Sequence, residues 1–337
     1  MFKVHIKNNH CDPHGFPNTP EGEEVFTITQ ERFETAAKNY PDVARELDVF
    51  IDWDTDNFVS SMADADVLVT WDLPTENLAE VAPNLKWIHI IGAGVEHLTP
   101  MDWIPKGVVL TNNKGVHSAK GGEFGIMSIL MLHSQMPAIV HNQRSAIYDS
   151  LYSTPIAGKT VVVIGVGNIG KSVADQAMKM GMNVIGVSRH GKKIPEVHEM
   201  HTVDNLDNLL PTADFVFVVT PMTEETRNLL NGDRIKLMKK GAGLVNIGRA
   251  GVVDYETLVE QLENGSLSGA ILDVFDQEPL PADSHFWNVK NLIVTPHISA
   301  DDGNAYVPLT LQVFFENMQR LVNDQPLQNQ VNTALGY

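Results

Sequence analysis

The feature that most constrains the fold is the segment VVVIGVGNIG at residues 161–170. A run of β-branched residues ends at Gly165, further glycines follow at Gly167 and Gly170, and a helical pattern begins at Lys171. The pattern predicts a strand, a tight turn and a helix start. Gly165 permits the turn, Gly167 lets the backbone approach a pyrophosphate, and Gly170 lets helix and strand pack closely. The first amides of the helix then face the phosphates. A turn with glycines for steric reasons alone is the alternative.

The rest of this region repeats the pattern of apolar strands separated by helical segments. Near-continuous apolar strands that alternate with helices indicate a parallel sheet covered on both faces. The six predicted strands, a number that matches a dinucleotide-binding domain, are Thr160–Gly165, Asn183–Val187, Phe215–Thr220, Gly243–Ile247, Gly269–Val274 and Leu292–Thr295.

The first part of the chain has a smaller α/β pattern. Strands are expected at Met1–Lys7, Val67–Trp71, Leu85–Gly92 and Val108–Thr111, and a helix at Glu31–Tyr40. Because 337 residues exceed what one core usually supports, we expect two domains. The predicted substrate domain comprises residues 1–117 and, through a helix at Val307–Leu321, residues 297–337. Residues 118–296 form the nucleotide domain. The predicted fold class is α/β, a Rossmann-type doubly wound parallel sheet inserted into a smaller, flavodoxin-like substrate domain.

A helix predicted at Gly122–Met136 is apolar nearly all round. Such a helix is buried, and we expect it in an interdomain or subunit contact, with Met127 and Met131 as core residues. It is short for a membrane span.

Composition limits the classes of partner. The formal net charge of −18 argues against binding to nucleic acid or to an anionic membrane. The single cysteine, Cys11, excludes an intrachain disulfide, and we expect a cytoplasmic protein. Cys11 lies between His10 and His14, which we interpret as a loop and not as a metal site. His198 and His201, one helical turn apart, are interpreted as a surface pair.

The second strand of the nucleotide domain ends in Val187-Ser188-Arg189, with Lys192 and Lys193 close behind. In this fold an acidic residue at that place holds the ribose 2′-hydroxyl. The stretch offers no carboxylate, whereas Ser188 and Arg189 can bind a 2′-phosphate. We therefore predict NADP(H), with NAD(H) bound at lower affinity. The alternative is that Arg189 only solvates a strand end.

Three polar stretches follow the later strands, where ligands of open α/β sheets bind: residues 246–251, 272–280 and 295–299. Together with the glycine turn, they make the chain resemble the D-isomer-specific 2-hydroxyacid dehydrogenase family, and within it the glyoxylate/hydroxypyruvate reductases. The resemblance covers nearly the whole chain and is strongest from Val161 to Ala300.

The resemblance implies a reduction of small 2-oxo acids, such as glyoxylate and hydroxypyruvate, by a hydride from NADPH. Arg249 resembles the arginine that binds the substrate carboxylate and polarises its carbonyl. His297 resembles the general acid, and Glu278 the carboxylate that orients it and favours its protonated form. Asp273 resembles the residue that binds the nicotinamide carboxamide.

The resemblance also implies the binding residues and the assembly. The substrate carboxylate is expected on the backbone of Ala93, Gly94 and Val95, beside Arg249 and His297. The residues expected to contact the cofactor are Gly165, Gly167, Asn168, Ile169, Gly170, Ser188, Arg189, Thr220, Pro221, Thr226, Ile247, Gly248, Arg249, Asp273, His297 and Ser299. No metal is expected, and the expected assembly is a homodimer.

Other activities in the same fold stay open. Formate dehydrogenases carry glutamine where Glu278 stands, so Glu278 argues against them. A D-lactate- or phosphoglycerate-type dehydrogenase and a dinucleotide-sensing corepressor remain alternatives. The family usually has glycine at the position of Ala250 and often a tryptophan in the stretch of Tyr148 and Tyr152. Trp71 is a candidate wall of the substrate pocket.

Overall fold

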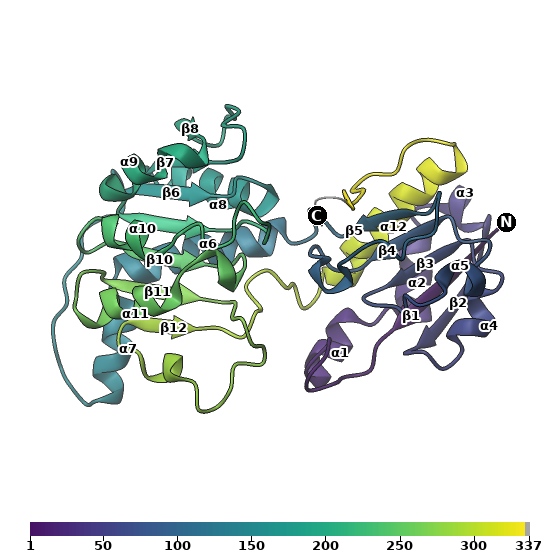
Figure 1. Ribbon diagram of the computed structural model, residues 1–337, viewed down its shortest axis with the longest axis horizontal. Helices are drawn as coiled ribbons and strands as arrows, with labels where there is room; N and C mark the ends of the chain where they lie inside the picture. The colour runs from purple at the N-terminus through teal and green to yellow at the C-terminus, as the bar shows by residue number, and fades with distance from the viewer. Residues whose placement is uncertain (334–337) are drawn as a thin grey trace. The chain divides into compact units, whose positions relative to one another are not determined.

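The computed structural model describes residues 1–333 and divides into two compact units (Figure 1). The first unit is Met1–His117 together with the chain from Asp302 onward, and the second is Ser118–Asp301. Residues 297–301, which we had expected in the returning segment, therefore lie in the second unit. They are held there because the Asp273 carboxylate accepts hydrogen bonds from the backbone amides of Ile298 and Ser299. The last four residues of the predicted returning segment, 334–337, lie outside the described residues.

The first unit is a parallel sheet with helices on both faces. Its strands have the order β2-β1-β3-β4-β5, the flavodoxin-like order, as predicted. The elements are β1 (Phe2–Asn8), α1 (Pro20–Phe26), α2 (Gln30–Ala37), α3 (Pro41–Ala44), β2 (Leu47–Trp53), α4 (Phe58–Met62), β3 (Val67–Thr70), α5 (Leu78–Val81), β4 (Trp87–Ile90), β5 (Val109–Asn112) and α12 (Tyr306–Val322).

The alternation of side chains along its strands builds two cores. Val67 and Val69 of β3 face a cluster with Phe33 of α2 and Phe314 of α12, whereas Leu68 faces α4 and α5. Helix α12 thus returns to this sheet. Strand β2 was not predicted, because it is an edge strand of alternating exposure that lacks a continuous apolar run.

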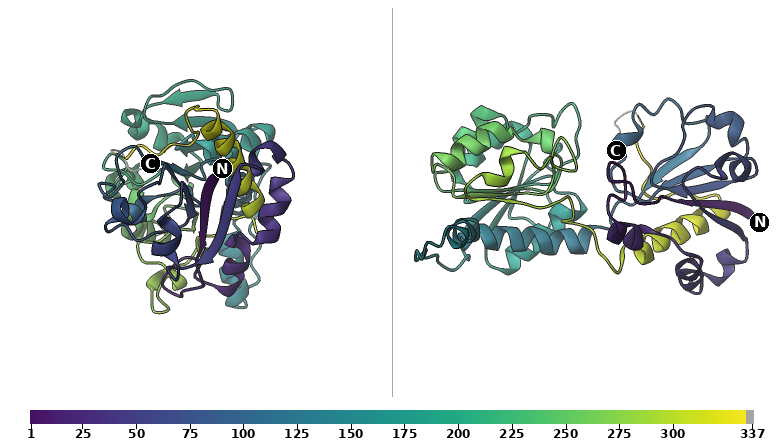
Figure 2. Two further views of the ribbon diagram at one scale, coloured as in Figure 1. Left: turned by 90° about the vertical axis from the view of Figure 1, so that its right-hand side faces the viewer. Right: turned by 90° about the horizontal axis from the view of Figure 1, so that it is seen from below.

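The second unit is a larger parallel sheet, whose strands have the order β12-β11-β10-β9-β6-β7-β8. Helices cover both of its faces (Figure 2). This is the predicted Rossmann-type arrangement. The elements are α6 (Ser118–His133), α7 (Met136–Arg144), β6 (Thr160–Ile164), α8 (Asn168–Lys179), β7 (Asn183–Val187), β8 (Glu199–His201), α9 (Leu206–Leu209), β9 (Phe215–Val218), α10 (Gly232–Leu237), β10 (Gly243–Asn246), α11 (Tyr255–Glu263), β11 (Gly269–Leu272) and β12 (Leu292–Val294).

The unpredicted strand β8 adds a seventh strand to this sheet within the described residues. It has only three residues and pairs with β7 at the sheet edge, so it leaves no clear apolar pattern. The interpretation of His198 and His201 as a pair one helical turn apart was therefore wrong. His201 ends β8, and His198 Nδ1 accepts a hydrogen bond from the Val184 amide.

Helix α6 is buried against its own unit, and the expected interdomain or subunit contact of this helix stays a prediction. Ile129 and Phe124 belong to the core that covers the sheet beside α8. The α6 backbone approaches α8 closely because Gly122 and Gly125 face it, where a Cβ would collide with Ser172 and Val173. Met131 is partly buried on this core, but Met127 is 44% exposed, so its assignment to the core was wrong.

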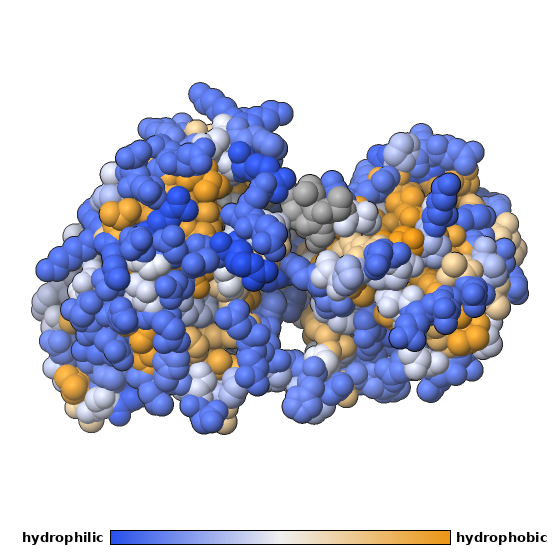
Figure 3. Space-filling view, in the orientation of Figure 1, coloured by the Kyte–Doolittle hydropathy of each residue, from blue (hydrophilic) through white to orange (hydrophobic). Residues whose placement is uncertain are grey.

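In the described part of the chain, no single helix has the length and apolar character needed to cross a membrane. Among the helices of residues 1–333, the pair α6 and α7, bent by 67°, meets those two criteria together. Figure 3 shows hydrophilic side chains over much of the visible surface of each unit, consistent with the strongly acidic composition.

Candidate functional site

The glycines between β6 and α8 have three different physical roles. Gly165 has a positive φ of 100°, which L-residues rarely adopt. A Cβ on Gly170 would collide with the carbonyl oxygen of Gly165, so only glycine lets α8 begin this close to the strand. A Cβ on Gly167, by contrast, would meet no described atom within 4 Å. The turn thus leaves open space beside Gly167, on the side where a pyrophosphate would bind.

Two further observations fit a dinucleotide at this turn. Helix α8 begins at Asn168 with Gly167 as its N-cap, so no side chain occupies its first amides. At the end of β9, Thr220 is 9% exposed and its hydroxyl oxygen has no hydrogen-bond partner among the described residues. Gly248 brings the next loop against Thr220, since a Cβ there would lie 2.8 Å from the Thr220 carbonyl oxygen. A buried, unpaired hydroxyl beside an uncapped helix start suits a bound cofactor.

Ser188 and Arg189 lie just after β7, as predicted, but a carboxylate accompanies them. Arg189 Nε donates to Glu225 Oε2 at 2.8 Å. Our interpretation that no carboxylate is available at this strand end was therefore wrong. Glu225 belongs to the loop after β9, 36 positions from Arg189, so the sequence around β7 does not reveal it.

The other predicted cofactor residues after β9 organise their own loop. Thr226 Oγ1 donates to the Pro221 carbonyl at 2.7 Å and accepts from the Thr223 amide at 2.8 Å. Ile169, in the first turn of α8, contacts Gly121 of α6. These contacts stabilise the loops that follow β6 and β9, at the carboxyl-terminal ends of the strands.

His297 and Glu278 form a hydrogen-bonded pair. The Nδ1 atom of His297 lies 2.7 Å from Glu278 Oε2, and Glu278 Oε1 accepts from the Phe275 amide at 2.7 Å. Both carboxylate oxygens of Glu278 are thus engaged, which fixes the carboxylate and through it the imidazole plane. With Nδ1 facing Glu278, the Nε2 atom is left to face a substrate.

The electrostatics of the pair favour a protonated imidazole. Burial opposes protonation of His297, but the hydrogen bond and the charge of Glu278 outweigh it and raise the His297 pKa above 6.5. For Glu278, burial acts to raise the pKa, and the hydrogen bond and charge of His297 outweigh burial and lower it. Such a pair matches the requirements of a general acid and its orienting carboxylate.

Arg249 follows β10, and a network that our sequence reasoning missed holds its loop. Asn246 is fully buried, and its Nδ2 donates to the Arg249 carbonyl at 3.0 Å and to the Tyr255 hydroxyl at 2.9 Å. Tyr255 in turn donates to the Val274 carbonyl at 2.9 Å. The Arg249 side chain bonds the Gly248 carbonyl at 2.8 Å. Asn246 is the first residue of the predicted polar stretch 246–251 but was given no role, and its polar side chain at the end of an apolar strand was the available signal.

Asp273 is fully buried at the end of β11 and is engaged within the protein. Its carboxylate accepts from Thr295 Oγ1 at 2.6 Å, from the Ile298 amide at 3.1 Å and from the Ser299 amide at 3.0 Å. These bonds hold the segment that carries His297. The predicted contact with a nicotinamide remains a prediction, and the observed contacts add a role in positioning His297.

The predicted carboxylate-binding residues Ala93, Gly94 and Val95 lie after β4 in the first unit. The Ala93 carbonyl accepts from Asn112 Nδ2 at 2.7 Å. Trp71 lies beside this loop: its ring contacts Gly92 so closely that a Cβ there would collide. Trp71 also stacks on His97, with ring centroids 4.4 Å apart. Trp71 thus lies next to the loop and is fixed by its neighbours, and its role as a wall of the substrate pocket stays a prediction.

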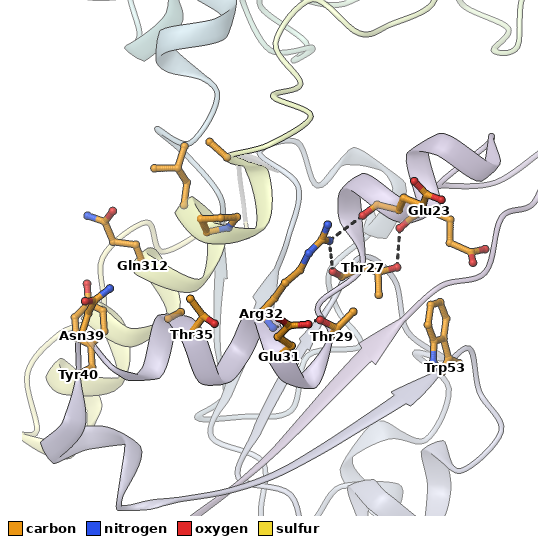
Figure 4. Close-up of a pocket in the computed structure, with 15 residues that line it drawn as sticks. Glu23, Thr27, Thr29, Glu31, Arg32, Thr35, Asn39, Tyr40, Trp53 and Gln312 are labelled. Carbon is orange, nitrogen blue, oxygen red and sulfur yellow. Dashed lines mark hydrogen bonds between the residues drawn. The ribbon is translucent and has the colours of Figure 1, made fainter.

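A separate cavity of about 1040 Å³ lies beside α1, α2 and α12 in the first unit (Figure 4). Glu23, Glu31, Arg32 and Trp53 are among its lining residues, and none of the predicted site residues is. Residues 1–333 contain no group of three His, Cys, Asp or Glu side chains placed to hold a metal ion. His10 instead pairs with Asp54, Nδ1 to Oδ2 at 2.5 Å.

Residues 126–299 match the family model described as "D-isomer specific 2-hydroxyacid dehydrogenase, NAD binding domain". The chain is 30% identical to a D-3-phosphoglycerate dehydrogenase of Methanocaldococcus jannaschii, across 90% of this chain and 59% of that protein. It is 31% identical to a glyoxylate reductase of Thermofilum pendens, across 70% of this chain and 72% of that protein.

Among solved structures, one similar protein is an NADPH-dependent glyoxylate/hydroxypyruvate reductase from Sinorhizobium meliloti in complex with NADP and sulfate. The TM-score is 0.78 at 26% identity, and all of both chains is covered. The chain spans only 47% to 59% of the length of three D-3-phosphoglycerate dehydrogenases that it matches.

Proposed function

Because the chain belongs to the D-isomer specific 2-hydroxyacid dehydrogenase family, we propose that it reduces small 2-oxo acids, glyoxylate and hydroxypyruvate, to 2-hydroxy acids with NADPH. The observation that carries this proposal is the His297–Glu278 pair, whose Nδ1 and Oε2 atoms are 2.7 Å apart. The pair lies at the carboxyl-terminal ends of the parallel strands, as does the Arg249 loop. NADP(H) is supported by the Ser188-Arg189 strand end and by the solved relative that binds NADP. NAD(H) binds at lower affinity.

The residues have the following roles in the proposed mechanism. Arg249 binds the carboxylate of the 2-oxo acid and polarises its carbonyl. The backbone of Ala93, Gly94 and Val95 binds the same carboxylate. His297 donates the proton on Nε2 to the carbonyl oxygen, while Glu278 holds Nδ1 and stabilises the imidazolium. A bound NADPH would supply the hydride that reduces the carbonyl carbon. His297 then regains a proton from solvent.

The cofactor-binding roles are proposed on the same grounds. The first amides of α8, with Gly167, bind the pyrophosphate, and the unpaired hydroxyl of Thr220 donates to the bound cofactor. This cofactor site is lined by Pro221 and Thr226 in the loop after β9, and by Ile247 and Gly248 in the loop after β10. Asp273 and Ser299 bind near the nicotinamide, where Asp273 also positions His297.

A reductase assay tests the proposal. Purified protein is mixed with glyoxylate or hydroxypyruvate, and the loss of reduced-nicotinamide absorbance is followed with NADPH and NADH in parallel. We expect turnover that is faster with NADPH, and His297→Ala should lower turnover by roughly 10²- to 10⁴-fold. Equal turnover of His297→Ala and wild type would remove His297 from the mechanism. Binding of both cofactors without turnover of any short 2-oxo acid would favour a dinucleotide-sensing binding protein.

D-3-Phosphoglycerate is a second candidate substrate, because several of the curated relatives are D-3-phosphoglycerate dehydrogenases. The assay is run in the oxidative direction with D-3-phosphoglycerate, D-lactate and glycerate. If the kcat/KM for D-3-phosphoglycerate exceeds that for D-lactate and glycerate, D-3-phosphoglycerate replaces glyoxylate and hydroxypyruvate as the basis of the proposed substrate class.

We also propose a homodimer. The segment between α7 and β6 exposes large apolar side chains, with Ile147 at 53%, Tyr148 at 102% and Tyr152 at 87%. Exposed apolar residues gathered in one segment often mark an interface. Light scattering of the purified protein measures its mass, and Tyr148→Ser with Tyr152→Ser should shift it toward that of a monomer.

A further inference from the structure

The loop after β9 places a carboxylate at the proposed 2′-phosphate site. Glu225 is 36 positions from Arg189 in the chain, yet its Oε2 lies 2.8 Å from Arg189 Nε. The Arg189 side chain is 38% exposed and that of Glu225 67%, so the pair is accessible to a ligand. The guanidinium that would bind a 2′-phosphate is therefore already bound by an anion of the protein.

A carboxylate and a phosphate monoester accept from the same guanidinium donors, so they compete for Arg189. The negative charge of Glu225 also repels a phosphate. A ribose 2′-hydroxyl has the opposite relation to Glu225, because it can donate a hydrogen bond to a carboxylate. Ser188 does not discriminate in this way: its Oγ accepts from the Gly191 amide at 3.2 Å, and its own proton can be donated to either group.

We propose that Glu225 is a specificity-determining residue that weakens NADPH binding and thereby moderates the preference for NADPH over NADH. The inference rests on the proposed nicotinamide-dependent function and names a residue that acts on its cofactor choice. NADPH binding requires that Glu225 release Arg189 or share it, whereas NADH binding leaves the pair in place. Because the pair is exposed and screened by salt, the effect is modest, about two- to five-fold in affinity.

The chain offers a matched control. Glu224 is the preceding residue, is 91% exposed and lies 3.8 Å from Arg227, not at Arg189. Glu224→Gln and Glu225→Gln therefore remove the same charge from the same loop, but only Glu225→Gln removes the competitor of the phosphate. Thermal unfolding of both variants checks that the loop substitutions leave the fold intact.

The experiment measures the Kd of NADPH and of NADH at low salt by isothermal titration calorimetry for wild type, Glu225→Gln and Glu224→Gln. We expect Glu225→Gln to tighten NADPH about two- to five-fold while NADH tightens less or weakens, and Glu224→Gln to change both by less than about twofold. In Arg189→Ala, adding Glu225→Gln should give a smaller gain, because the competed donor is gone.

Equal tightening of NADPH by Glu225→Gln and Glu224→Gln would show a general charge effect and overturn the inference. An unchanged NADPH Kd in Glu225→Gln would overturn it as well, with the proposed reductase function intact. If wild type binds neither cofactor, the proposed function itself fails, and the inference with it.

Discussion

At the scale of single residues, His297 combines an unusual backbone with a tightly held side chain. Its φ of 54° lies in the left-handed region, which is uncommon for residues other than glycine. The Asp273 carboxylate bonds the next two backbone amides, and Glu278 bonds the imidazole. A conformation of this kind persists only where neighbouring contacts determine it. The contacts therefore orient Nε2 before any substrate binds.

The Glu278 charge should set the pH range of the reduction. Reduction needs protonated His297, whose pKa is raised by Glu278, so kcat/KM stays high at low pH and falls as pH rises through the His297 pKa. Glu278→Gln keeps a hydrogen-bond acceptor but removes the charge, so the His297 pKa decreases and the fall in kcat/KM moves to lower pH. The measurement is the pH profile of kcat/KM.

A second Glu–His pair in the same unit provides the control for this pH profile. Glu256 Oε1 lies 3.5 Å from His285 Nε2, outside the candidate site. Glu256→Gln should leave the profile of kcat/KM unchanged. An identical profile in Glu278→Gln and wild type would contradict the assignment of His297 as the acid.

At the scale of elements, the β6–α8 turn separates the requirements of folding from those of binding. Gly165 and Gly170 are needed by the chain itself, the first for its positive φ and the second for the close approach of α8 to the strand. A Cβ on Gly167 would meet no described atom within 4 Å, and φ at this position is an ordinary −83°. Neither the backbone conformation nor packing therefore requires glycine at position 167. Glycine suits the N-cap of α8, and we propose that the approach of a ligand also favours it.

The two glycines should respond differently to alanine. Gly170→Ala forces a Cβ against the Gly165 carbonyl oxygen and should lower the free energy of unfolding by about 1–3 kcal/mol. Gly167→Ala should lower the free energy of unfolding by at most about 1 kcal/mol, through the N-cap of α8, and should weaken cofactor binding at least about tenfold, because the Cβ would occupy the space proposed for the pyrophosphate. Denaturant unfolding and cofactor titration measure the two effects. A Gly167→Ala variant that binds NADPH like wild type would argue against a pyrophosphate at this turn.

At the scale of the whole molecule, the nucleotide unit is one uninterrupted segment, whereas the other unit is made from two segments of the chain. Residues 118–301 contain the whole seven-stranded sheet of the second unit and the two hydrophobic clusters that pack on it. Each unit thus has the buried clusters that an independent domain needs.

The segment 118–301 expressed alone should therefore fold and bind NADPH without reducing 2-oxo acids. It should unfold cooperatively, and NADPH at 100 times its Kd should stabilise it by about 2.7 kcal/mol. Calorimetry with and without NADPH measures this. Reductase activity in the fragment would show that Ala93, Gly94 and Val95 are dispensable. Absence of a cooperative transition would contradict its independence as a domain.

Local sequence patterns were enough to predict the class of fold and the main candidates for the site. Runs of apolar residues, the glycine spacing at 165–170 and the polar stretches after β10, β11 and β12 are local patterns, and local periodicity reports local structure. Edge strands such as β2 and β8 were missed, because short or half-exposed strands lack a clear apolar run.

The contacts between distant side chains depend on the tertiary structure. It placed Glu225 on Arg189, joined Asn246 to Val274 through Tyr255, and directed Asp273 to the backbone beside His297. It also buried α6 against α8 of its own unit. The physical reason is that these contacts join different strands and loops of one sheet, and side-chain distances across a sheet are set by strand order, which no local sequence pattern contains.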